Sequence, residues 1–218
     1  MIRVTVVLLL LIVASIHNVV SASESSVPLS DIDVETSPQA YQRGAKVVID
    51  VCMLCHNLKY IKYRNLADIG FNEQQVDALR GDKKLDDIFK ATMSDEVADK
   101  VFGMIPPDLS VMAKARKGGA NYIYTLLTSY HEQADGKIDN RLFPGIKMPD
   151  TLDLSVEIDD KRKQLQEQKA RDVSSFLLWA SDPHADTRHT MGAFVIGYFI
   201  LLTIMLWLWK RRVWADLK

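Results

Sequence analysis

Val51-Cys52-Met53-Leu54-Cys55-His56 is the most informative motif in this chain of 218 residues. Cys52 and Cys55 are its only two cysteines, and His56 follows directly. This C-x-x-C-H pattern is the attachment signature of a c-type haem. Two thiols at this spacing on a helical turn can form thioethers to the two vinyl groups on one porphyrin edge, and His56 then lies beneath the iron. The motif therefore predicts one covalent haem c per chain, with His56 as an axial ligand.

Two other uses of a C-x-x-C pair fit this sequence less well. A thioredoxin-like redox pair would need a surrounding βαβ pattern, which is absent here. A zinc site would need further ligands, and no other cysteine can supply them. An exported domain stabilised by disulfides would carry more cysteines, in pairs distant in sequence. Haem attachment is the interpretation that remains.

The residues before the motif predict a helix that presents it. Ser37-Pro38 is a favourable start, because Ser suits the N-cap and Pro suits the first helical position. Apolar residues then recur at helical spacing from Ala45 to Cys52, so this helix can hold the cysteines against a core. Gly44 is costly inside a helix. We expect it to mark a place where another helix packs closely.

The second axial ligand must come from elsewhere in the chain, and His and Met are the usual residues. Met1, Met191 and Met205 are terminal or lie in the apolar C-terminal segment, and Met53 is inside the motif, on the wrong turn to reach the far face. The remaining candidates are Met93, Met104, Met112 and Met148.

Met148 is favoured among these four by its surroundings. It stands in Phe143-Pro144-Gly145-Ile146-Lys147-Met148-Pro149, a loop that could reach over a haem face and is restrained by Pro149. Met112 has helical spacing and is more typical of a core residue. His131 is a rival that would give a bis-histidine haem, although a lone His beside Glu132 is more often a solvated loop residue.

The N-terminus has the order of a secretory signal peptide. Met1-Ile2-Arg3 precedes an apolar run from Val4 to Ala14, and small residues follow at Val20-Ser21-Ala22. The apolar run is too short to span ~30 Å of hydrocarbon as a retained N-terminal anchor. We therefore expect residues 1–22 to be a signal peptide that is cleaved after Ala22.

A membrane anchor is predicted at the other end. The uncharged run from Met191 to Trp209 would form about 28 Å of helix, which is enough to cross a bilayer. Tryptophans cluster at its end and Lys210-Arg211-Arg212 follow at once, as expected at the cytoplasmic face. A buried core helix would rarely end in three consecutive cations. The sequence therefore predicts a single-pass protein of the inner (cell) membrane, with its main domain on the periplasmic side.

The domain organisation follows from these two ends. Residues 23–189 form one haem domain, residues 190–210 the transmembrane anchor and residues 211–218 a cytoplasmic tail. A chain of this length with 48% hydrophobic residues can bury one sizeable core. We expect a mainly α-helical fold, with helices near 38–55, 108–130 and 160–181 and long loops around the haem. The domain has a small acidic excess, which argues against a nucleic-acid partner.

Most of the chain resembles the cytochrome c1 family, the haem subunit of the ubiquinol–cytochrome c reductase (cytochrome bc1) complex. The Pro-Pro-Asp-Leu-Ser and Arg-x-Gly-Gly blocks are the most specific features, since C-x-x-C-H alone occurs in many cytochromes. The matching blocks are Arg43-Gly44, Cys52 to His56, Tyr60, Tyr63-Arg64-Asn65-Leu66, Ile105 to Ser110, Ala115 to Gly119, Tyr122 to Leu127, Phe143-Pro144-Gly145, Phe176 to Ser181 and the basic end of the anchor.

The resemblance implies roles for several residues. Met148 occupies the family's position for the second iron ligand. Arg116 would face a haem propionate, because a guanidinium can bind a carboxylate in bidentate fashion; without the family it would read as a solvated charge. Pro106 and Pro107 would form a rigid wall beside the proximal face, and Tyr122 would pack near the haem edge. The implied fold is a class I cytochrome c-like haem domain.

The resemblance also implies partners. The haem would take an electron from the Rieske iron–sulfur protein and pass it to a soluble cytochrome c, in a dimeric complex with cytochrome b. The chain would have no substrate chemistry of its own. Two alternatives remain: a free-standing, tail-anchored electron carrier, and a peroxidase or gas sensor with an open sixth position.

One segment departs from the family. Where an acidic loop containing Gly and Thr is usual, Asp150 to Asp160 leads directly into a stretch rich in lysine and glutamine, which predicts an exposed helix continuing into Val173–Trp179. The segment between Leu66 and Ile105 is also short. Contacts that these loops would make with partner proteins are therefore open.

Overall fold

The computed structural model describes residues 27–156 and 159–215. The predicted signal peptide, residues 1–22, lies outside this range. The described chain is mainly α-helical, with two small antiparallel sheets, β1 with β2 and β3 with β4. In chain order its elements are α2 (Pro38–Asp50), η1 (Cys52–Leu54), β1 (Leu58–Lys62), η2 (Tyr63–Ile69), α3 (Glu73–Arg80), β2 (Ile88–Phe89), α4 (Asp95–Phe102), α5 (Met112–Ala115), α6 (Ala120–Thr128), β3 (Tyr130–Glu132), β4 (Ile138–Asn140), α7 (Asp160–Ala180) and α8 (Ala185–Ala215).

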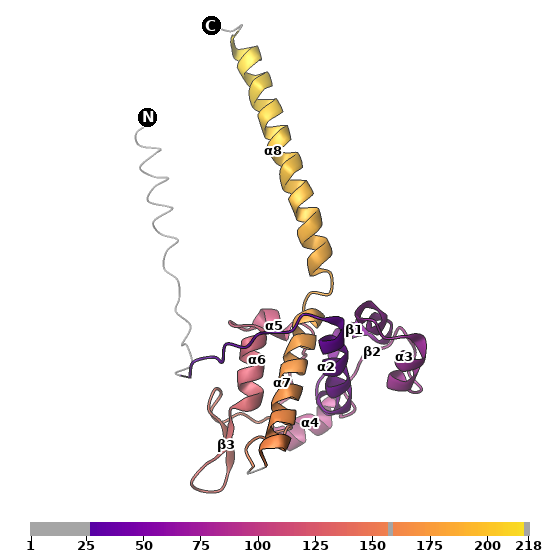
Figure 1. Cartoon of the computed structure of the whole chain (residues 1–218), viewed down its shortest axis with the longest axis vertical. Coiled ribbons are helices and arrows are strands. Elements are labelled where there is room, and N and C mark those ends of the chain that lie inside the picture. Colours follow the sequence, from indigo (N-terminus) through magenta and orange to yellow (C-terminus); the bar gives the residue numbers. More distant parts are fainter. Residues whose placement is uncertain (1–26, 157–158, 216–218) are drawn as a thin grey trace.

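Helix α7 is the centre of the globular domain. It packs against α2 on one side and α6 on the other, and Figure 1 shows the three helices as neighbouring layers. Phe176 is fully buried and Leu177 nearly so, on the part of α7 that faces these helices. Helix α7 begins and ends within one residue of the expected 160–181. Its first half is largely exposed and its second half is largely buried, as the sequence predicts.

Helix α2 begins as the sequence predicts. Ser37 is its N-cap, and the Ser37 side chain accepts a hydrogen bond from the backbone N–H of Ala40 at 3.2 Å. The expected close packing at Gly44 is also present. A Cβ atom at Gly44 would collide with the backbone carbonyl of Asp172 and would lie 2.7 Å from the Cβ atom of Phe176. The glycine therefore lets the backbones of α2 and α7 touch.

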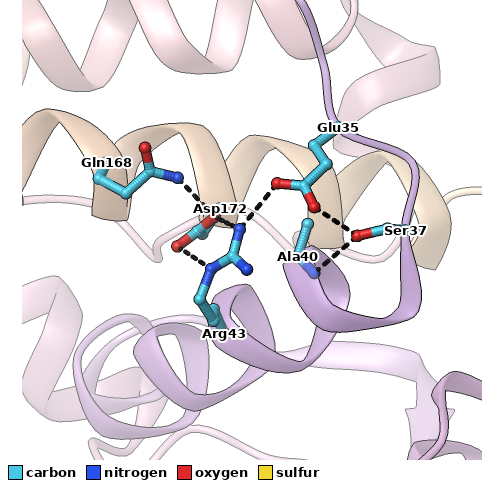
Figure 2. A network of polar contacts seen from close by, with 6 residues as sticks. All are labelled: Glu35, Ser37, Ala40, Arg43, Gln168 and Asp172. Carbon is cyan, nitrogen blue, oxygen red and sulfur yellow. Dashed lines mark hydrogen bonds and ion pairs between the residues drawn. The ribbon is translucent and has the colours of Figure 1, made fainter.

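A polar network joins α2 and α7 to Glu35, in the segment before α2 (Figure 2). The guanidinium of Arg43 donates two hydrogen bonds to the carboxylate of Asp172, from Nε at 3.0 Å and from Nη2 at 2.8 Å. Arg43 Nη2 also contacts Glu35 Oε2 at 2.8 Å, and Gln168 Nε2 donates to Asp172 Oδ1 at 3.0 Å. The side chain of Asp172 is only 7% exposed. Its charge is therefore compensated by one bidentate cation and one amide.

Two of the predicted helices are shorter than the sequence suggests. The first ends at Asp50, and the cysteine motif forms a separate 3₁₀ turn after Val51, which has φ −114° and ψ −57°. The predicted helix over 108–130 is interrupted between α5 and α6. Gly118 and Gly119 have φ of +92° and +56° at this break, a backbone conformation that only glycine adopts readily.

Helix α8 extends away from the globular domain, as Figure 1 shows. Within the part of the chain that the structure describes, residues Thr187–Ala215 of this helix are the one stretch long and apolar enough to cross a membrane. Its large side chains are exposed, including those of Phe194, Trp207 and Trp214. In a bilayer these side chains would contact lipid, so α8 is the candidate membrane anchor within the described residues.

Candidate haem site

An apolar cavity of about 250 Å³ lies in the globular domain, and the predicted site residues surround it. Its walls come from the 3₁₀ turn η1, from α5, α6 and α7, from the 102–109 stretch and from the 143–151 loop. The residues predicted for the haem site that line it are Cys52, Cys55, His56, Pro106, Pro107, Arg116, Tyr122 and Met148. Segments far apart in the chain thus converge on one cavity.

His56 lies at the wall of the cavity and is 8% exposed. Its Nδ1 atom is 2.8 Å from the carbonyl oxygen of Pro107, an oxygen that can only accept a hydrogen bond. Nδ1 is therefore the protonated nitrogen, and Nε2 keeps its lone pair. Burial lowers the pKa of His56, although the Pro107 hydrogen bond opposes this. The imidazole is thus held neutral with one nitrogen free to bind a metal.

The two thiols lie at the same wall. Cys55 and His56 both donate backbone hydrogen bonds to the carbonyl of Cys52, at 3.1 and 2.8 Å, which forms the tight turn. Burial, and then the neighbouring Cys55, raise the pKa of Cys52 to about 12. Among the described residues, no three His, Cys, Asp or Glu side chains gather into a metal-binding group.

The stretch from Pro107 to Ser110 is fixed beside the motif by its own hydrogen bonds. Asp108 accepts from the backbone N–H of Lys59 at 3.0 Å and from that of Ser110 at 2.9 Å. The hydroxyl of Ser110, which is fully buried, accepts from the N–H of Tyr60 at 3.1 Å. These bonds tie the Pro-Pro-Asp-Leu-Ser block to β1. They hold the Pro107 carbonyl where it meets His56.

The motif is held on another side by residues 91–93, in the loop between β2 and α4. The carbonyls of Met53 and Leu54 accept backbone hydrogen bonds from Thr92 and Met93, at 2.9 and 3.0 Å. The amide oxygen of Asn57 accepts from the N–H of Ala91 at 2.8 Å. The short loop before α4 thus forms a strap across the motif.

Met148 reaches the cavity on the loop between β4 and α7 and is partly buried there. The hydroxyl of Tyr130 donates a hydrogen bond to the backbone carbonyl of Met148 at 3.0 Å. Burial raises the pKa of Tyr130, and the carboxylates of Asp150 and Asp139 add to this effect, so the hydroxyl remains a donor.

Arg116 and Tyr122 lie together at the cavity. Arg116 ends the short helix α5 and is exposed, while Tyr122 is half-buried in the first turn of α6. The guanidinium carbon is 6.0 Å from the centre of the tyrosine ring, within the range of a cation–π contact. The Gly118-Gly119 break between α5 and α6 turns the chain so that both side chains meet the same opening. A cation at the edge of an apolar cavity suits a ligand with an apolar body and an acidic group.

The other predicted ligand candidates divide into two groups. Met104 and Met112 line the cavity together with Met148, whereas Met93 and His131 are not among its lining residues. His131 lies on β3 opposite Asp139, not in a solvated loop, and its Nδ1 atom is buried without a partner among the described residues. The bis-histidine alternative is therefore not supported.

Several residues at the cavity were not predicted from the sequence. Phe102 and Ile146 complete the walls, and Leu126 and Leu127 contribute from α6. Helix α7 contributes Val173 and Leu177, which are four residues apart on one face. That helical spacing is a signal the sequence does contain, but it indicates only a core-facing stripe.

A model of the Cytochrome C1 family matches residues 34–217, which is most of the chain. The chain belongs to the cytochrome c1 family. It is 34% identical over 221 residues to cytochrome c1 of Rhodospirillum rubrum, covering 81% of each protein. It is 32% identical over 227 residues to cytochrome b/c1 of Bradyrhizobium diazoefficiens, covering 81% of this chain and 33% of that protein.

The chain is also similar to the ammonia monooxygenase gamma subunit of Nitrosomonas europaea. The identity is 26% over 216 residues, which cover 90% of this chain and 91% of that protein.

Membership of the cytochrome c1 family agrees with the architecture. The family has a c-type haem and acts in electron transfer as a subunit of bc1-type respiratory complexes. The observed chain has a mainly helical haem domain followed by one long apolar helix. The cavity has apolar walls, and the cation of Arg116 lies at its edge, so its residues fit the apolar body and the acidic groups of a haem.

Proposed function

We propose that this chain binds one haem c covalently and relays electrons in a cytochrome bc1 complex. Thioethers from Cys52 and Cys55 would hold the porphyrin, and His56 and Met148 would be the two iron ligands. The bound haem iron would supply one-electron redox chemistry, receiving an electron from the Rieske iron–sulfur protein and delivering it to a soluble cytochrome c. The single observation that carries the proposal is the convergence of these residues on one apolar cavity.

The proximal side supports a role for His56 as ligand. Metal-binding histidines usually donate their second ring N–H to an oxygen, which fixes the tautomer and the ring orientation. The 2.8 Å contact between Nδ1 and the Pro107 carbonyl has this arrangement. Pro107 would act through its carbonyl as well as through its rigid ring.

Met148 is the best placed of the three cavity methionines. Met112 follows the 106–110 stretch, whose Pro107 carbonyl is bonded to His56. Met104 precedes that stretch and is 46% exposed. Met148 comes from a separate loop, and we expect its thioether to approach from the side opposite His56.

The remaining cavity residues would set the potential and the orientation of the haem. Apolar walls exclude water, which favours the less charged ferrous state and raises the reduction potential. Arg116, stacked beside Tyr122, would neutralise a propionate. Arg116 is exposed, so this side of the cavity would be the one open to a partner protein.

The complex and the membrane side are part of the same proposal. The Bradyrhizobium relative is named cytochrome b/c1, which supports a partnership with cytochrome b, here in a dimeric complex. Lys210, Arg211 and Arg212 at the end of α8 favour a cytoplasmic location for the tail. We place the chain in the inner membrane after removal of residues 1–22, with the domain of residues 23–189 in the periplasm, the anchor at 190–210 and the tail at 211–218.

Rapid spectroscopy of membranes that contain this chain tests the electron pathway. Addition of ubiquinol should reduce the c-type absorption band, and oxidised soluble cytochrome c should then reoxidise it. An inhibitor of the Rieske step should block the reduction and leave the reoxidation intact. A c-type band that ubiquinol does not reduce would contradict the proposed place in the complex, and a free-standing carrier would then be the better account.

A further inference from the structure

Residues 141–148, called the Met148 loop below, are attached at both ends to one β-hairpin. Strands β3 and β4 pair in antiparallel register, with Tyr130 directly opposite Asn140. Both side chains are buried, Tyr130 at 6% and Asn140 at 0% exposure. The loop leaves β4 immediately after Asn140 and reaches Met148 before the chain enters α7. The two facing residues are therefore in position to fix the start and the end of the loop.

Asn140 fixes the start of the loop. Its Nδ2 atom donates to the carbonyl of Leu126 at 2.7 Å, and its Oδ1 atom accepts from the backbone N–H groups of Leu142 at 3.0 Å and Phe143 at 3.1 Å. The neighbouring Asp139 accepts from the N–H of Gly145 at 2.8 Å. Leu126 lies on α6 at the cavity wall. The hydrogen bond from Asn140 therefore fixes the start of the loop relative to the cavity.

Tyr130 fixes the end of the loop at Met148, the proposed iron ligand. Its hydroxyl donates to the carbonyl of Met148 at 3.0 Å, across a separation of 18 residues. The carbonyl belongs to Met148 itself, and Pro149 follows without a backbone N–H. A hydrogen bond from a buried phenol on a strand restrains this backbone more firmly than a solvent contact would.

We propose that Tyr130 is a positioning residue for Met148. Through its hydrogen bond to the Met148 carbonyl, Tyr130 would hold the thioether in position to bind the haem iron. The inference rests on the proposed role of Met148 as an iron ligand. Tyr130 does not itself line the cavity. Its effect therefore passes through the backbone of Met148, and loss of the hydroxyl should weaken the bond between Met148 and the iron while covalent attachment of the haem is retained.

The test substitutes Tyr130→Phe in the full-length, membrane-bound holoprotein. The ferric methionine–iron charge-transfer absorption in the near infrared reports the Met148 bond, and carbon monoxide binding to the ferrous protein reports its displacement. Loss of one hydrogen bond to a buried carbonyl should shift the equilibrium between bound and released Met148 by about tenfold. The pH at which alkali abolishes the absorption should then fall on the order of one unit.

Tyr63→Phe is the matched control. Tyr63 is a buried tyrosine at 1% exposure, it packs on Phe89, and it lies on η2 away from the Met148 loop. Its substitution removes a hydroxyl from a comparable environment and should leave the Met148 absorption and its pH dependence as in the wild-type protein. An equal shift in both variants would show a general loss of packing and overturn the proposal.

A double-mutant cycle separates this inference from the proposed function. In a Met148→Ala background there is no thioether to position, so Tyr130→Phe should leave the midpoint potential unchanged; a further fall in that background would contradict positioning. If Met148→Ala alone has no effect on the potential, the ligand assignment itself fails. If Tyr130→Phe prevents covalent haem from accumulating, Tyr130 serves folding, and the positioning role is wrong.

Discussion

His56 and Met148 come from opposite halves of the chain and meet at one cavity, and the neighbours of each explain how. The Pro107 carbonyl fixes the tautomer of His56, and the Pro107 carbonyl is itself fixed by the bonds of Asp108 and Ser110 to β1. Met148 depends on the hairpin that contains Tyr130. The chemistry proposed for the site therefore depends on backbone carbonyls and their partners as well as on the ligand side chains.

Met148→Ala is expected to retain covalent haem and to lower the midpoint potential by at least about 0.1 V, well within the span that axial ligands can produce. The reason is that a thioether ligand stabilises the ferrous state. Redox titration of the detergent-solubilised protein measures the change. Met93→Ala is the control, since the Met93 side chain is not among those lining the cavity. An unchanged potential in Met148→Ala would remove Met148 from the ligand sphere.

The sequence is informative about these residues to different degrees. The C-x-x-C-H spacing is a chemical requirement of haem attachment, so Cys52, Cys55 and His56 can be proposed from the motif alone. The position of Arg116 at the cavity could not be derived from spacing, because it depends on the Gly118-Gly119 break, and it was expected only from the family resemblance. Met112 has the spacing of a core helix but lines the cavity, because in this fold the cavity is the core.

Among the elements, the packed pair of α2 and α7 positions the cysteine motif, which follows α2 in the chain. Gly44 brings the two backbones into contact. Arg43, the residue before Gly44 on α2, pairs with Asp172 of α7. Helix α2 ends at Asp50, directly before the cysteines. Any change in the distance between α2 and α7 would therefore displace the 3₁₀ turn that carries the two thiols.

Arg43→Met should lower the free energy of unfolding by about 3 kcal/mol, because the buried Asp172 carboxylate loses its cation. The substitution keeps an apolar stem of similar length, so packing changes little. Denaturant unfolding of the holoprotein, followed by the haem absorption, measures the effect.

Glu35→Gln provides the comparison for this pair. The Glu35 side chain is 51% exposed, so its contact with Arg43 should contribute less than about 1 kcal/mol. If both substitutions had equal effects, the Arg43–Asp172 pair would not be the contact that stabilises the helix pair.

Element boundaries show where sequence reasoning ends. Helix α7 was predicted nearly to the residue, because its change from a charged to an apolar composition is a local signal. The predicted helix over 108–130 was interrupted because two consecutive glycines with positive φ outweigh the apolar spacing on either side. The hairpin of β3 and β4 was not predicted at all, since each strand has only three residues.

At the scale of the whole molecule, the domain and α8 are connected by a short polar junction. Asp182 lies between them and pairs with Lys114 of α5 at 2.5 Å and with Arg188 of α8. The hydrogen bond from Lys114, and then the charge of Arg188, lower the pKa of Asp182. The junction therefore connects the anchor to α5, the helix directly before Arg116.

The proposed orientation can be tested with single added cysteines, because the two native cysteines would be occupied by haem. Lys163→Cys lies on the exposed first half of α7, and Arg212→Cys lies at the basic end of α8. An impermeant thiol reagent applied to cells with a permeable outer membrane should label Lys163→Cys. It should label Arg212→Cys only after the inner membrane is opened. Labelling in the reverse order would place the haem domain in the cytoplasm.

The central claim, a covalent c-type haem in a bc1-type complex, is tested most directly by a reduced-minus-oxidised visible spectrum. The spectrum is recorded on membranes solubilised in mild detergent and followed through purification of this chain. We predict a c-type α-band that stays with the chain after denaturation and a b-type band that co-purifies with it before denaturation. A c-type band alone would contradict membership of the complex, and the absence of any c-type band would contradict the assignment of Cys52, Cys55 and His56.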